Sequence, residues 1–208
     1  MSTSCQRQGG IESLVGDWNC IRIELSGDGT KVGTKVGRSI HVVNFTFTLV
    51  DRPTAESLAG NYTLAILRTG EDYFDLAAGL QHITQEIKDL SHIKVNGEQY
   101  MIEYFMGGDW KFPAVVCGLN AANSDYSCVW CKCPSGDHWD MKKEWSVSDT
   151  TKWARTIEEI KSLSKQPHKK CIKTLIFSSI PIDHIIIDTL HFFLRIADLL
   201  INLLIIWS

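Results

Sequence analysis

The order in which hydrophobic periodicities change along the first half of the chain limits its fold more than any other feature. Apolar and polar residues alternate over residues 20–25 and 41–50, as they do in half-buried strands, and residues 62–67 fit a third short strand. Over residues 73–90 the apolar side chains recur at helical spacing instead. This change of periodicity within one chain predicts an α/β protein.

Two glycine-framed aspartates follow strand-like segments. Asp28 lies in a Ser-Gly-Asp-Gly-Thr stretch, which predicts a turn directly after the first strand. Asp109 follows a further strand over residues 100–106, and an Asn96-Gly97 hairpin signal precedes that strand. If the two strands are neighbours, their ends bring together two carboxylates that are 81 residues apart in sequence, which suits a divalent cation. Each aspartate also has an ordinary alternative role, Asp28 in a turn and Asp109 as the N-cap of a following helix.

Composition favours a reducing compartment. The 208 residues are 44 % hydrophobic, enough to bury the core of one domain, and the formal net charge of −3 argues against indiscriminate binding to polyanions. Residues 1–10 are polar and lack the apolar centre of a signal peptide. We therefore expect the seven cysteines to be thiols or metal ligands.

A cluster of potential zinc ligands lies in the second half of the chain. Cys128 and Cys131 have the two-residue separation that is typical of thiolates bound to tetrahedral zinc. Cys133 and His138 lie close enough in sequence to complete four ligands. A reduced thiol pair without metal is the alternative.

Basic residues are unevenly distributed. Three of them follow Asp28 with no acid before Asp51, and residues 141–173 contain nine Lys or Arg against four Asp or Glu. Basic stretches on either side of an acidic site suit a phosphate backbone such as that of DNA, and a solvated surface is the alternative. The predicted DNA contacts are Lys31, Lys35, Arg38, Lys111, Lys142 and Lys143.

The chain ends in a strongly apolar segment over residues 185–207, long enough to raise the possibility of a membrane span. Its polar residues nevertheless recur at intervals of 3, 4, 3 and 4 and so share one stripe of a helix. Isolated charges are costly in lipid, so the stripe favours a buried amphipathic helix and no contact with a membrane. The stripe consists of Asp188, His191, Arg195, Asp198 and Asn202.

Five motifs in this order carry a resemblance to a known family. They are Ser26-Gly-Asp-Gly-Thr30, the strand that begins at His41, Gly107-Gly-Asp-Trp-Lys111, Cys128-Val-Trp-Cys131 and Ile187-Asp-Thr-Leu-His191. From about residue 20 to its end the chain resembles DDE transposases, in particular the Transib group and the catalytic subunit of the V(D)J recombinase.

The resemblance implies a ribonuclease-H-like mixed sheet with helices, and two-metal phosphoryl transfer on DNA with Mg²⁺ or Mn²⁺. Asp28 would bridge the two ions and Asp109 would hold one of them. Asp188 and His191 match the family's Asp-x-x-His motif and would orient the site. A homodimer and a nuclear location follow from the same resemblance.

The sequence departs from the family pattern downstream. The glutamate that completes the family's catalytic triad has no counterpart here, since Glu158 and Glu159 match no motif, and the histidine pair that completes the family's zinc site is missing too. The expectation is a C-terminally truncated, transposon-derived protein that does not cleave DNA by itself. A domesticated DNA- or protein-binding module, using the cysteine cluster and the basic stretch, is the alternative.

These observations predict four segments. A polar tail over residues 1–19 precedes a core that carries both aspartates over residues 20–127. Residues 128–179 form a zinc-knuckle-like and basic insertion, in which the tryptophan-rich stretch 139–167 lies outside the core. Residues 180–208 return to the core as an apolar strand and helix.

Overall fold

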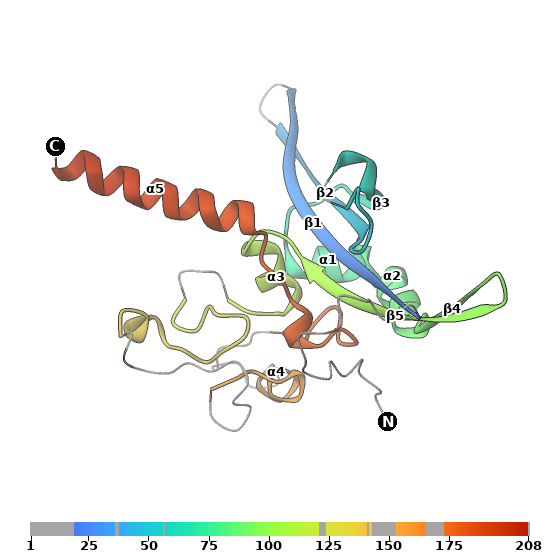
Figure 1. The fold of residues 1–208 in the computed structure, drawn as a ribbon. Coiled ribbons are helices and arrows are strands. Elements are labelled where there is room, and N and C mark those ends of the chain that lie inside the picture. The colour runs from blue at the N-terminus through green and yellow to red at the C-terminus, as the bar shows by residue number, and fades with distance from the viewer. Residues whose placement is uncertain are drawn as a thin grey trace.

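The structure, a computed structural model, describes residues 19–35, 38–55, 57–120, 124–140, 142, 153–164 and 173–207. Figure 1 shows the arrangement of its helices and strands. The strands are β1 (Cys20–Lys35), β2 (Arg38–Leu49), β3 (Asn61–Leu67), β4 (His92–Val95) and β5 (Glu98–Gly107). The α-helices are α1 (Tyr73–Gly79), α2 (Gln81–Asp89), α3 (Lys111–Val116), α4 (Ile157–Leu163) and α5 (Thr189–Trp207). Three short 3₁₀ helices are η1 (Leu58–Gly60), η2 (Ser135–Asp137) and η3 (Ile182–His184).

The five strands form one mixed sheet in the order β3-β2-β1-β5-β4. Strand β1 runs antiparallel to β2 and parallel to β5, while β2 with β3 and β4 with β5 are antiparallel pairs. Beyond the short β4, the same edge of β5 is joined by Ile185, which forms a parallel bridge with Met106. The predicted α/β class is therefore confirmed.

The turn predicted at Asp28 is wrong. Strand β1 runs on through the glycines to Lys35, and Asp28 pairs with Asn44 in the middle of the β1–β2 ladder. The long run of β-branched and aromatic residues in β2 supplies a partner for β1 from Ile23 to Lys35, and this pairing overrides the local turn preference of the Gly-Asp-Gly sequence.

The helix predicted over residues 73–90 is two helices that meet at Leu80. The backbone of Leu80 has φ −99° and ψ 5°, so the residue ends α1 and begins α2. Gly79, a poor helix former, directly precedes it. The Leu80 side chain is fully buried, so the break between the two helices directs this leucine into the core.

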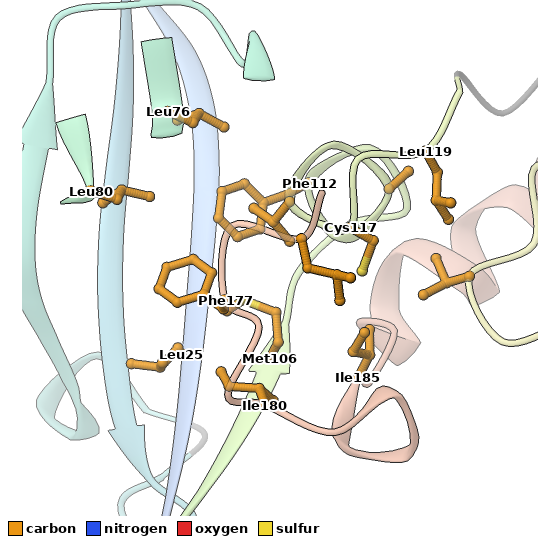
Figure 2. Close-up of a cluster of buried hydrophobic side chains, with 14 of the residues drawn as sticks. Leu25, Leu76, Leu80, Met106, Phe112, Cys117, Leu119, Phe177, Ile180 and Ile185 are labelled. Carbon is orange, nitrogen blue, oxygen red and sulfur yellow. The ribbon is translucent and has the colours of Figure 1, made fainter. Parts of the chain in front are cut away.

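Helices α1, α2 and α3 cover one face of the sheet and enclose the core, part of which Figure 2 shows. Aromatic rings join the layers: Phe45 of β2 stacks on Phe177 at 5.6 Å and lies 6.2 Å from Phe112 of α3. The prediction that residues 139–167 lie outside the core is wrong for α4, since Ile160 is buried in this same cluster. Apolar helical spacing around Ile160 signals burial even within a charged stretch.

The prediction that the C-terminal helix is buried is also wrong. Every side chain described from residue 189 to residue 205 is exposed, and Figure 1 shows α5 projecting away from the sheet. Helical periodicity fixes which side chains share a face, but it does not supply an element to cover that face. Among the described residues, no helix combines the length and the apolar character that a membrane crossing requires.

Candidate functional site

Asp28 and Asp109 both lie just past the point where the parallel pairing of β1 with β5 ends. The last β1–β5 pair is Ser26 with Gly107, and each aspartate comes two residues later in its own segment. The segments stay side by side past this pair, since a Cβ built on Gly108 would lie 3.4 Å from the carbonyl oxygen of Gly27. The positive φ of Gly108, 139°, then turns the chain out of β5 towards α3. The topology thus brings the two acidic segments together.

The Asp109 carboxylate is fixed at the start of α3. Its Oδ1 accepts a hydrogen bond from the backbone N–H of Phe112 at 2.9 Å, which confirms the predicted capping role. This bond leaves Oδ2 outside the cap. Asp28, by contrast, is exposed, and the backbone ladder of β1 with β2 holds its segment in place.

Glu71 links the two acidic segments, a contact that sequence reasoning missed. Its Oε1 accepts a hydrogen bond from the backbone N–H of Gly29 at 2.9 Å, and its Oε2 forms an ion pair with Lys111. The Glu71 side chain is only 7 % exposed, whereas that of Lys111 is 63 % exposed. Lys111, predicted to contact DNA, therefore has a carboxylate partner within the chain. Nothing in the sequence around Glu71 signals this role.

A second missed carboxylate, that of Glu24, lies beside the end of β5. A Cβ on Gly107 would stand 1.9 Å from Glu24 Oε1, so the glutamate occupies the space that the glycine leaves. Burial, and to a lesser extent the charge of Asp188, raises the pKa of Glu24 above its ordinary value. Asp188 reaches the same place because its N–H bonds to the Gly108 carbonyl at 2.9 Å. Alternation along β1 places Glu24 among the polar positions of the strand, but it does not show which β5 residue leaves room for its side chain.

Asp188 and His191 form a hydrogen-bonded pair at the start of α5. Asp188 Oδ2 and His191 Nδ1 are 2.8 Å apart, and Asp188 Oδ1 accepts from the N–H of Leu190 at 2.8 Å. Burial opposes ionisation of Asp188, but the bonds from His191 and Leu190 outweigh it, so the pKa of Asp188 is lowered. The pair thus presents an anionic carboxylate beside Gly108.

The donor set fits a hard divalent cation in kind but falls short in number. Carboxylate oxygens are the ligands that Mg²⁺ and Mn²⁺ prefer, and Asp28 and Asp109 supply them from adjacent segments. Within the residues that the structure describes, however, no three His, Cys, Asp or Glu side chains are grouped closely enough to hold a metal ion. Any ion held by the two aspartates would complete its coordination with water or phosphate oxygens.

The cysteine cluster is assembled in part. The N–H of Cys131 lies 3.3 Å from Cys128 Sγ, and a hydrogen bond from the Cys131 thiol is the largest of the effects that lower the pKa of Cys128 to about 6. The same bond, together with burial, raises the pKa of Cys131. Cys133 and His138 are not brought into a metal-binding group with this pair among the described residues. Zinc binding there stays a prediction.

A buried arginine holds the loop that carries Cys128 and Cys131. The guanidinium of Arg155, 4 % exposed, donates to the carbonyl oxygens of Cys128 at 2.8 Å, Cys131 at 3.1 Å and Tyr126 at 2.9 Å. These bonds satisfy a charge that would be costly to bury alone. The loop is therefore shaped by protein contacts before any metal binds.

Trp130, between the two cysteines, connects this loop to the sheet. Its indole N–H donates to the carbonyl oxygen of Ile185 at 3.0 Å, and its ring meets Trp110 edge to face at 5.9 Å. Trp110 follows Asp109 directly in sequence. The cysteine loop thereby contacts the segment that follows β5 and the segment that bridges to Met106 near the end of β5.

The predicted DNA contacts are only partly described. Lys31 is exposed on β1 opposite His41, and Lys142 is exposed as well. Lys35 and Arg38 pair through their backbones, but their side chains, like the whole of Lys143, lie outside the described residues.

The sequence was also compared with known proteins. No model of a protein family matches the chain, and no curated protein matches it either.

Proposed function

We propose that the chain derives from a DDE transposase of the Transib and V(D)J-recombinase kind, and that Asp28 and Asp109 hold Mg²⁺ or Mn²⁺ against a DNA phosphodiester. The observation that carries this proposal is the parallel pairing of β1 with β5, which ends two residues short of both aspartates. The strand order β3-β2-β1-β5-β4, with helices on one face, is consistent with the ribonuclease-H-like fold that we propose for it. A DNA partner, a homodimer and a nuclear location belong to the same proposal.

Each residue of the site has a separate task. Asp109, fixed by its bond to Phe112, would offer its second oxygen to a cation, and Asp28 would offer a carboxylate from the rigid ladder of β1. The Asp188–His191 pair would orient the region beside Gly108. When bound, the metal ions would stabilise the attacking and leaving oxygens of a phosphoryl transfer.

We expect weak metal binding and no DNA cleavage from residues 1–208. The resemblance implies three acids, and two of them have counterparts here. With so few protein ligands, Mn²⁺ affinity should be on the order of millimolar. Loss of one metal-binding acid can remove several kcal/mol of transition-state stabilisation, roughly a thousand-fold or more in rate.

Mn²⁺ titration and a plasmid-nicking assay test the proposal. The wild-type chain should bind Mn²⁺, Asp109→Asn should weaken that binding strongly, and Asp89→Asn, at the far end of α2, should leave it unchanged. Unaltered binding in Asp109→Asn would remove the metal assignment and favour a binding module without chemistry. Mg²⁺-dependent nicking that disappears in Asp28→Ala would show instead that another acid, such as Glu158 or Glu159, completes an active site.

A further inference from the structure

We infer that Glu71 is a positioning residue that holds Asp28 and Asp109 at a fixed separation, an inference that rests on the proposed metal site. Glu71 lies on neither of the strands that lead to the aspartates: it precedes α1, in the connection from β3. We use the name Glu71 clasp for its carboxylate together with the N–H of Gly29 and the ammonium of Lys111.

The clasp grips each acidic segment close to its aspartate. Gly29 directly follows Asp28, and Lys111 comes two residues after Asp109. One oxygen of Glu71 accepts the N–H of Gly29 at 2.9 Å, and the other pairs with Lys111. A single rigid group thereby connects the two segments.

The sheet alone does not fix this separation. Backbone pairing of β1 with β5 ends at Ser26 and Gly107, two residues short of both aspartates. Past that point β1 pairs with β2, while the other segment turns away at Gly108. The Glu71 side chain, bonded to the Gly29 backbone and to the Lys111 ammonium, joins the diverging segments beside the two aspartates.

Gly29 makes the close approach possible. A Cβ at this position would lie 2.7 Å from Cγ, Cδ and Oε1 of Glu71, well inside van der Waals contact. A side chain there would push the carboxylate away from the backbone N–H. Gly29, which the sequence alone predicts to be a turn residue, thus lets the Glu71 carboxylate reach the backbone of β1.

Burial makes the clasp stiff and separates its role from that of a metal ligand. The Glu71 side chain is 7 % exposed, and a carboxylate at such depth is stable only while it is paired and hydrogen-bonded. Both of its oxygens already have partners in Gly29 and Lys111. Glu71 therefore acts on the cation through the backbone beside Asp28 and through the start of α3.

The test combines amide hydrogen exchange at Gly29 with Mn²⁺ affinity in the full chain. In Glu71→Ala, exchange at the Gly29 amide should accelerate and Mn²⁺ affinity should fall about tenfold, the size of effect that losing a hydrogen bond to a charged group produces. Glu86→Ala, an exposed change on α2, should alter neither quantity. In an Asp109→Asn background, Glu71→Ala should cause no further loss of Mn²⁺ affinity, because positioning has no effect once the ligand is gone.

Milder variants keep the test decisive if Glu71→Ala does not fold. Glu71→Gln preserves the shape of the side chain and removes its charge, and Lys111→Met leaves the Glu71 charge unpaired. Each should weaken Mn²⁺ binding, and combining them should recover part of the loss, since the double variant contains no unpaired buried charge.

The possible failures are distinguishable. Wild-type Mn²⁺ affinity that persists within twofold in both Glu71→Ala and Glu71→Gln, while the Gly29 amide exchanges faster, would overturn the positioning role and leave the metal site standing. A wild-type chain that binds no Mn²⁺ would overturn the proposed function and this inference with it.

Discussion

Replacing Gly27 by alanine should destabilise the chain by packing one methyl group too many between β1 and α3. A Cβ at Gly27 would lie 2.2 Å from Cε2 and 2.3 Å from Cζ of Phe112, far inside normal contact. The Phe112 ring is fully buried and packs against Phe45, so it has no open space to move into. Overpacking of this kind costs about 1–3 kcal/mol. For a chain of this length that corresponds to a fall in Tm of about 2–12 °C.

Thermal unfolding followed by circular dichroism measures this effect. Phe112→Leu makes room for the methyl group, so Gly27→Ala should cost markedly less in that background than in the wild type. The matched control is Gly70→Ala, where a Cβ meets no atom within 4 Å and the Tm should stay within about 2 °C. If Gly27→Ala unfolds at the wild-type temperature, or if the two penalties simply add, β1 and α3 do not pack as described.

Three further predictions concern a carboxylate, a thiol and a helix. The raised pKa of Glu24 means that its protonated form favours the fold, and this stability is lost as the pH rises through the folded-state pKa. Glu24→Gln should therefore raise Tm at pH 7 but not near about pH 3, where Glu24 is protonated in the folded and the unfolded chain alike. An equal gain in Tm at the two pH values would contradict the raised pKa. The Cys128 thiol should react with iodoacetamide at pH 7 in zinc-free protein. Protein purified under reducing conditions should contain up to one Zn²⁺ per chain, and this zinc should be lost in Cys128→Ser; zinc retained in that variant would exclude the cluster as its ligand. Because α5 exposes apolar side chains from Leu190 to Ile205, deleting residues 199–208 should reduce self-association in light scattering while Mn²⁺ binding persists. Unchanged association would place the contact elsewhere.

The sequence predicted those elements in which the local hydrophobic periodicity distinguishes a strand from a helix. Alternation in β2 and the Asn96-Gly97 hairpin signal predicted the strands, and Asp109 capped its helix as expected. The turn at Asp28 failed because strand pairing is a non-local contact, which a glycine-rich stretch does not announce. The prediction that α5 is buried failed because an apolar helix face favours burial but does not supply a neighbouring element to pack against it.

The candidate site divides in the same way. Glycine-framed aspartates are visible as a motif, and the parallel pairing of β1 with β5 gives their shared position. Glu71 carries no motif, because its role depends on a side chain that reaches two segments distant in sequence. Glu24 is likewise explained only by the space above Gly107.

Electron paramagnetic resonance of Mn²⁺ in a double-mutant cycle tests most directly whether Asp28 and Asp109 hold one shared site. The samples are the wild type, Asp28→Asn, Asp109→Asn and the double variant, with Asp89→Asn as the control. If both carboxylates ligate the same ion, each single change should reduce the bound Mn²⁺ signal strongly, and the double variant should bind no more weakly than the worse single variant. Losses of affinity that add independently, or a double variant that binds Mn²⁺ as well as the wild type, would contradict a shared metal site where the β1–β5 pairing ends.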